Sequence, residues 1–177
     1  MILISPSKNL NIRSETINFN FSEPKFKKKI KALSDSLKGL SISELKSLMP
    51  ISDKLVELNI KRFENFGKPD NPKKPAVFLF TGATFDGLSI RSFDKDSYDY
   101  VQRNLRILSG LYGILKPFDI IQPYRLEMGT NTVKLINSSL YEFWSNDISK
   151  NLNEELKTNG SKYLFNLSSK EYFSVLD

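Results

Sequence analysis

The fold depends most on the stretch Leu105-Arg106-Ile107-Leu108-Ser109-Gly110-Leu111-Tyr112-Gly113-Ile114-Leu115-Lys116. Its apolar residues continue the helical period of Tyr98 and Val101 and then run into Gly-Leu-Tyr-Gly, which more apolar residues and a lysine follow. Two glycines three residues apart allow a tight turn of the backbone that can come close to a ligand. We therefore predict a helix-hairpin-helix between residues 95 and 122.

The predicted turn would direct main-chain N–H groups outward at the start of its second helix. Such a group of donors, together with the helix N-terminus, can hold a phosphate oxygen. Leu111 would pack back between the two helices, and Lys116 would add a charge contact. Contacts of this kind grip the DNA backbone and read no bases, so binding should be insensitive to sequence and sensitive to salt. The alternative is that Gly110 and Gly113 only end one helix and turn the chain.

Strands and helices alternate along the rest of the sequence. This order predicts a single domain over residues 1–177, of mixed α/β or α+β class, with a central mixed sheet flanked by helices. Buried strands are expected at residues 1–4, 76–80, 132–136 and 163–167. Amphipathic helices are expected at residues 22–39, 41–50, 52–67, 94–108 and 140–159, and a capping box at residues 168–171 starts a further helix.

The composition excludes several classes of protein. None of the 177 residues is cysteine or histidine, so the chain cannot build a disulfide, a zinc–thiolate site or a Ser-His-Asp triad. Any general base would be Asp, Glu, Lys or Tyr, and any metal would need oxygen ligands. We predict no cofactor and no metal site. The net charge of +6 and the pI of about 9.4 are compatible with nucleic acid as a partner, and also with an ordinary lysine-rich surface.

The location follows from what the sequence lacks. No run of about 18 apolar residues predicts a membrane span, and the start of the chain has no basic region of the kind that opens a signal peptide. The apolar residues 1–4 read instead as a strand that begins at once. We expect a cytoplasmic monomer that makes no contact with a membrane.

Two short polar motifs are further candidates for a site. Ser5-Pro6-Ser7-Lys8 has the Ser-x-x-Lys spacing of serine acylases. A strand precedes it and Pro6 follows the serine directly, so we interpret it as a turn that presents Lys8 at the end of a strand. Arg125 and Glu127 would share a face of an extended segment. They would form an ion pair there, or Arg125 would offer its forked donors to a phosphate.

Several segments together resemble the YaaA family, which is associated with peroxide stress. They are residues 4–10, 51–63, 82–88, 108–119, 123–129 and 166–173. The resemblance implies a family-specific fold and a cytosolic protein of the oxidative-stress response. It implies that a helix-hairpin-helix binds double-stranded DNA and that the protein limits damage from intracellular iron and peroxide. It also implies that residues 1–177 are an incomplete family domain, because family members continue with a basic, glycine-containing segment.

The predicted DNA contacts come from the turn and from cations around it. They are Ser109, Gly110, Leu111, Tyr112 and Gly113 in the turn, and Lys8, Lys54, Arg106, Lys116 and Arg125 around it. We expect a binding protein with no catalytic residues, although the sequence leaves enzymatic activity undecided.

Two other functions stay open on the sequence alone. Helix-hairpin-helix glycosylases place a lysine and an aspartate after the hairpin, and Lys116 and Asp119 have corresponding positions for a glycosylase or lyase. Base removal also needs a pocket for the flipped base. An iron-handling protein would have to use carboxylates such as Asp94, Asp96 and Asp99, which are more simply explained as a cluster at the start of a helix.

Overall fold

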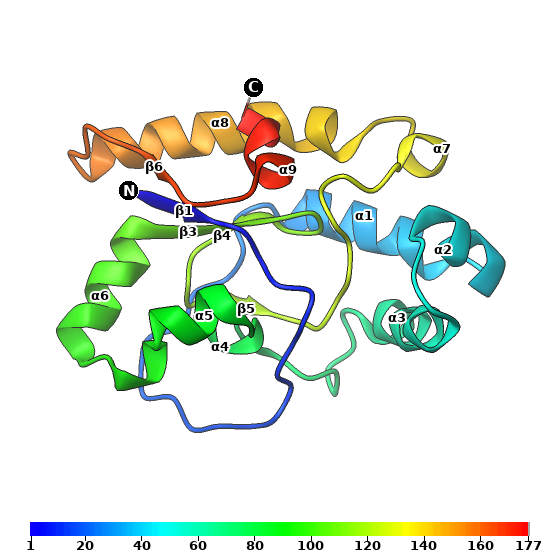
Figure 1. The fold of residues 1–177 in the computed structure, drawn as a ribbon, viewed down its shortest axis with the longest axis horizontal. Helices are drawn as coiled ribbons and strands as arrows, with labels where there is room; N and C mark the ends of the chain where they lie inside the picture. Colours follow the sequence, from blue (N-terminus) through cyan, green and yellow to red (C-terminus); the bar gives the residue numbers. More distant parts are fainter. Residues whose placement is uncertain (177) are drawn as a thin grey trace.

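A small mixed sheet lies at the centre of the molecule, with helices on both sides (Figure 1). The computed structural model describes residues 1–176. The strands of the sheet run in the order β4-β3-β1-β6, and their bounds are Ile2–Ile4 for β1, Leu105–Ser109 for β3, Gly113–Leu115 for β4 and Phe165–Asn166 for β6. β1 is parallel to both of its neighbours and β4 is antiparallel to β3, so the predicted mixed α/β class is confirmed.

The other elements surround this sheet. α8 runs along one side of it, with η2 packed against α8, while α4, α5 and β5 lie on the opposite side (Figure 1). β2 and β5 form a short antiparallel ribbon, and α2 packs on α3 at one end of the molecule. The bounds are Lys27–Lys38 (α1), Ile42–Leu48 (α2), Asp53–Asn65 (α3), Lys74–Pro75 (β2), Ala76–Leu79 (α4), Ala83–Leu88 (α5), Ile90–Ser92 (η1), Lys95–Asn104 (α6), Ile120–Ile121 (β5), Val133–Ile136 (α7), Leu140–Thr158 (α8), Lys170–Phe173 (α9) and Ser174–Leu176 (η2).

The first two helices follow the apolar period of their sequences, and a capping box starts the second. α1 buries Ile30, Leu33 and Leu37 along one stripe, as the sequence predicted. α2 begins with the predicted capping box, in which Ser41 and Glu44 each satisfy a backbone N–H of the other. The start of α2 is therefore encoded locally, whereas α1 begins at Lys27 without a side-chain cap, so the helix start predicted at residue 22 is wrong: the Ser22 hydroxyl donates to Asp119 instead.

The stretch 105–116 forms a β-hairpin, and the helix-hairpin-helix predicted for residues 95–122 is wrong. α6 ends at Asn104, and the backbone is already extended at Leu105. β3 then pairs with β4 on one side and with β1 on the other, and all of its residues are buried. A strand buried on both faces is apolar nearly throughout, and such a run continues a helical apolar period as readily as it fills a strand.

The turn of this hairpin lies inside the protein. Ser109 Oγ accepts a hydrogen bond from the Tyr112 amide at 3.0 Å and lies 2.6 Å from the Tyr124 hydroxyl. The Trp144 indole N–H donates to the Gly110 carbonyl at 2.9 Å. Every residue of the turn is buried, so its amides lie in the protein interior. The prediction that these amides face outward is therefore wrong. The phosphate contact predicted at this turn depended on that geometry.

Two of the predicted strands are helices. The run Ala76–Leu79 forms α4, and Phe80 follows it with an isolated bridge to Leu10. Every residue of α4 is buried, so the run is apolar throughout and shows neither the strand period nor the helical one. The strand predicted at residues 132–136 is α7, which ends where Asn137 adopts the left-handed conformation.

Gly110→Ala is expected to lower the free energy of unfolding by about 1–3 kcal/mol, because the new methyl group would overlap the Leu126 carbonyl oxygen. Gly39→Ala is the matched control, since a methyl group there meets open space. The control should leave stability unchanged or raise it by about 0.4–1 kcal/mol. Chemical denaturation followed by Trp144 fluorescence measures both variants, and equal stabilities would contradict the buried turn.

Candidate anion-binding site

A basic cluster lies where the loop after β1, helix α3 and the segment after β5 meet. We define it by four residues, Lys8, Arg62, Arg125 and Glu127. Lys8 Nζ lies 2.8 Å from one Glu127 carboxylate oxygen, and Arg125 Nη2 lies 2.8 Å from the other. Burial lowers the pKa of the Arg62 guanidinium, and the charge of nearby Arg125 lowers it further. Lys8 and Arg125 thus share the Glu127 carboxylate, and Arg62 lies close enough to Arg125 for the two charges to interact.

The basic cluster opens onto a hollow of about 630 Å³ between the end of α2 and the segment that follows Arg125. Its charged lining residues are Lys8, Arg125, Glu127 and Glu171, and residues 129–131 line it as well. Residues 48–51, around the junction between α2 and α3, supply most of its apolar lining. A hollow of this size can take a small ligand or a protruding group of a larger one.

The extended segment after β5 sets the direction of two members of the cluster. Tyr124, Leu126 and Met128 are buried, and the residues between them point away from the core. Arg125 and Glu127 therefore share a face, as the sequence predicted, and they form the ion pair that was one of its two alternatives.

Hydrogen bonds to the chain between α4 and α5 hold the loop that carries Lys8. The Thr81 amide donates to the Asn9 carbonyl at 3.1 Å, and the Asn11 amide donates to the Leu79 carbonyl at 2.7 Å. The Lys8 side chain itself is mostly exposed. This arrangement agrees with the interpretation of the motif as a turn that presents Lys8 at the end of a strand.

Arg125 keeps a donor that no other group within residues 1–176 uses. Its Nη2 donates to Glu127, whereas its Nε is buried and has no hydrogen-bond partner in that part of the chain. A buried donor without a partner costs free energy, and a bound anion or an ordered water is the usual way to satisfy it. Because the planar guanidinium fork matches two oxygens of a phosphate or carboxylate, the cluster suits an anion.

Glu127 is the internal counter-charge of the cluster. Burial raises the pKa of its carboxyl, but the hydrogen bonds and charges of Lys8 and Arg125 outweigh burial and hold the pKa below its ordinary value. The carboxylate is therefore ionised at neutral pH, and it competes with an external anion for both cations. A phosphate that enters the hollow has to share these cations with Glu127 or displace it.

Two cations of this region lie on α3. Lys54, which the sequence predicted as a DNA contact, is exposed on the first turn of α3 and does not line the hollow. Arg62, about two turns further along the same helix, is half-buried beside Arg125. The sequence interpretation missed Arg62, and the one signal for it was its place near the end of residues 51–63, a segment that carries the family resemblance.

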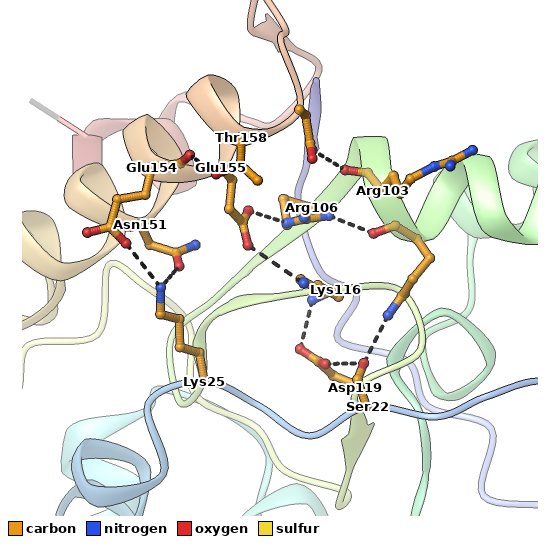
Figure 2. A network of polar contacts seen from close by, with 12 residues as sticks. Ser22, Lys25, Arg103, Arg106, Lys116, Asp119, Asn151, Glu154, Glu155 and Thr158 are labelled. Atoms are coloured by element: carbon orange, nitrogen blue, oxygen red, sulfur yellow. Dashed lines mark hydrogen bonds and ion pairs between the residues drawn. The ribbon is translucent and has the colours of Figure 1, made fainter.

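A second polar network, centred on Arg106, joins the sheet to α8 (Figure 2). Arg106 is almost fully buried, and its Nε donates to Glu155 at 2.7 Å. Its Nη1 donates to the backbone carbonyls of Leu105 and Gln102. The sequence predicted that Arg106 contacts DNA from the surface. The guanidinium lies instead inside the protein, where it ties β3 to α8.

The same network contains the two residues on which a glycosylase or lyase would depend. The buried Asp119 carboxylate accepts hydrogen bonds from the Ser22 hydroxyl at 2.6 Å and from the Lys116 amide at 2.8 Å (Figure 2). Burial raises the pKa of the Asp119 carboxyl, and these hydrogen bonds oppose that rise. The Lys116 side chain lies 3.9 Å from Glu155. Asp119 thus has structural partners, whereas the Lys116 side chain is about half exposed and lines, with Asp119, a hollow of about 340 Å³.

Residues 1–176 offer neither a cluster of metal ligands nor a membrane span. In this part of the chain, no group of three or more acidic side chains is placed to hold a metal ion. Asp94 caps α6 by accepting the Ser97 amide at 2.8 Å, as the sequence predicted for this helix start. The same residues contain no helix that is long and apolar enough to cross a bilayer.

The fold and the basic cluster define a mixed α/β protein with an open hollow whose charged lining residues are Lys8, Arg125, Glu127 and Glu171. The family model described as "Peroxide stress protein YaaA" matches residues 1–177. A UPF0246 protein of Idiomarina loihiensis is 42% identical over 178 residues, which cover 99% of this chain and 69% of that protein. A UPF0246 protein of Flavobacterium johnsoniae is 44% identical over 178 residues, which cover 99% of this chain and 70% of that protein.

The chain belongs to the family of the peroxide stress protein YaaA, as its resemblance predicted. Four of the segments that carry the resemblance meet at the hollow and the basic cluster beside it. They supply Lys8, Ile51, Arg62, Arg125, Glu127 and Glu171. Since these segments are far apart in the sequence, their convergence makes the basic cluster, and not the buried hairpin, the candidate site.

Glu127→Gln is expected to lower the free energy of unfolding at pH 7 by about 0.5–1 kcal/mol, because Lys8 is exposed and its ion pair is screened. The folded pKa of Glu127 is depressed below the ordinary 4.5, so its stabilisation is present above pH 4.5 and is lost as the pH falls through the folded pKa. Urea denaturation between pH 3 and pH 7 measures the difference. Glu57→Gln removes an exposed carboxylate on α3 and should change the stability at pH 7 by less than about 0.5 kcal/mol. A deficit for Glu127→Gln that is the same at pH 3 and pH 7 would contradict the ion pair.

Glu155→Gln is expected to lower the free energy of unfolding by about 3–5 kcal/mol, because it leaves the buried Arg106 guanidinium without its counter-charge. Glu154→Gln is the matched control at the preceding position of α8, where an exposed carboxylate pairs with the exposed Lys25. The control should cost less than about 1 kcal/mol. Thermal or urea denaturation compares the two, and equal losses would place Arg106 outside the core.

Proposed function

We propose that this protein binds the phosphate backbone of double-stranded DNA through the basic cluster, as part of the response to peroxide stress. The observation that carries the proposal is the pairing of Lys8 and Arg125 with the single Glu127 carboxylate at an open hollow, with Arg62 close enough to Arg125 for their charges to interact. Membership of the peroxide stress family supports the physiological setting.

The chemistry of the cluster matches a phosphodiester. An arginine fork can donate to two phosphate oxygens at once, and a lysine adds a point charge that tolerates some movement. Lys54, exposed on the same helix as Arg62, supplies a cation for a neighbouring phosphate of the strand.

Binding of this kind reads charge and spacing and ignores base identity. Contacts to phosphates position a protein on DNA but carry no direct sequence information. The affinity should therefore be similar for unrelated duplexes, and it should fall steeply as salt is added. The net charge of +6 acts in the same direction, because it attracts the polyanion at long range.

The same electrostatics links DNA binding to protection from peroxide. A protein that neutralises phosphates with lysine and arginine releases the cations condensed on the DNA. Iron ions held at the phosphates are among the cations that would be released. Peroxide would then react with iron away from the DNA, so that fewer strand breaks follow. This protective step requires neither a redox centre nor a bound metal in the protein.

Lys8→Gln is expected to weaken binding to duplex DNA by about three- to tenfold at 0.1 M salt and to reduce the slope of log K against log salt by about 1. Lys157→Gln is the matched control, because Lys157 is an exposed lysine on the last turn of α8. That end of α8 lies at the other end of the molecule from α2 and α3 (Figure 1). Fluorescence anisotropy with two unrelated duplexes of equal length measures both variants. Equal effects of the two substitutions would refute the assignment to the cluster.

Glu127→Gln gives the opposite test at the same place. Removal of the competing carboxylate should tighten DNA binding, because Lys8 and Arg125 lose their internal partner. The Lys8→Gln and Glu127→Gln variants should thus shift the affinity in opposite directions while the fold is retained. Weaker binding by both variants would show that the cluster acts only as a structural ion-pair network.

A further inference from the structure

The strand β6 has an open edge. It is the last strand in the order β4-β3-β1-β6, and within residues 1–176 no strand pairs with its outer side. The Phe165 amide donates to the Met1 carbonyl at 2.8 Å, and the Leu167 amide donates to the Leu3 carbonyl at 2.9 Å. Because successive peptide groups along a strand point to opposite sides, the N–H and C=O groups of residues 164 and 166 face the open edge.

The side chains beside this edge are large, apolar and exposed. Tyr163, Phe165 and Leu167 are 70%, 60% and 69% exposed, and as alternate residues they lie on one face of the strand. The rings of Tyr163 and Phe165 are 6.4 Å apart, so they form a continuous aromatic surface. We call these three side chains the β6 stripe. Single exposed apolar residues are ordinary, whereas contiguous exposed apolar patches are the surfaces through which proteins interact.

The edge also lacks the features that keep strand edges apart from other chains. Natural edge strands carry inward-pointing charges, prolines or bulges, or a helix covers them. Residues 163–167 are Tyr-Leu-Phe-Asn-Leu, with neither a charge nor a proline. An apolar, uncharged edge with free backbone groups is a template for another strand.

We propose that the β6 edge is the docking surface for a β-strand supplied by the residues that longer family members carry outside the region matched by this chain. The match to the two relatives includes 99% of this chain but only 69% and 70% of theirs. The relatives therefore share the region that contains β6 and have nearly a third of their length in addition. The β6 edge is where the shared region offers both free strand hydrogen-bonding groups and a contiguous apolar face.

The geometry of β6 sets two requirements for the added strand, one for its backbone and one for its side chains. Its backbone has to pair with the N–H and C=O groups of Leu164 and Asn166. Apolar side chains at alternate positions would pack against Phe165 and its neighbours in the β6 stripe, as cross-strand pairs do. The added strand would extend the central sheet on the side of β6, away from the hairpin of β3 and β4.

Hydrogen exchange at the β6 edge tests the proposal. Two proteins are compared, the 177-residue chain and the same chain joined to the unmatched residues of the Flavobacterium johnsoniae relative, at the end where that relative carries them. The amides of Leu164 and Asn166 should exchange at least about tenfold more slowly in the longer protein. Equal exchange rates in both proteins would overturn the proposal.

A matched pair of substitutions separates docking at the stripe from a general gain in stability. Phe165→Asp in the longer protein should restore fast exchange at Leu164 and Asn166. Tyr100→Asp, which alters an aromatic residue of α6 with similar exposure (57%), should leave the slow exchange unchanged. Equal effects of the two substitutions would also count against the proposal.

Two further measurements cover a joined protein that does not fold and a second copy of the chain at the β6 edge. If the joined protein does not fold, the same exchange experiment is done on the full-length Flavobacterium johnsoniae relative and on its matched region alone, at the positions aligned with Leu164 and Asn166. Fast exchange at these positions in the full-length relative would overturn the proposal. Light scattering on the 177-residue chain identifies a dimer, and a dimer with slow exchange at Leu164 and Asn166 would assign the edge to a second copy and overturn it as well.

Discussion

The indole of Trp144 lies against the turn between β3 and β4, and most of the structure depends on this contact. Its N–H donates to the Gly110 carbonyl, and its ring fills the space that a side chain at Gly113 would need. Gly110 in turn meets the backbone of Leu126 and Glu127. One buried turn thus fixes α8 on the sheet and also fixes the segment that carries the basic cluster. The two glycines serve close packing of protein on protein, which is a use of small residues that a ligand-binding turn shares.

The two polar networks divide the charged residues by what surrounds them. Arg106 and Glu155 are shielded from water, and their pairing holds β3 to α8 (Figure 2). Lys8 and Glu127 are more exposed, and together with Arg125 they line a hollow that is open to solvent. A buried pair is expensive to break and acts as structure, whereas a half-exposed pair can exchange its partner for an external anion. This difference in burial is the physical reason for seeking function at the basic cluster.

Local signals predicted the helices better than the strands. The apolar stripe of α1, the capping box at Ser41 and the long amphipathic helix α8 all form as their sequences indicate, because the residues that decide them lie within a few positions of one another. The pairing of Arg125 with Glu127 could also be predicted, since alternation along an extended segment needs no knowledge of the rest of the chain. The runs 76–79 and 105–109 were assigned wrongly, because full burial removes the polar positions that reveal the period.

The sequence by itself determined which kinds of site this chain cannot build and which family it belongs to. Without cysteine or histidine it cannot build a disulfide, a zinc–thiolate site or a Ser-His-Asp triad, and the family follows from segments that can be read in order along the chain. Only the tertiary structure decided that the stretch 105–116 is a buried hairpin and that positions 8, 62 and 125 form one cluster. The reason is that a strand forms only where it has partner strands, and a binding site forms only where side chains from different segments meet. Both depend on contacts between residues that lie far apart in the sequence, and no local pattern encodes those contacts.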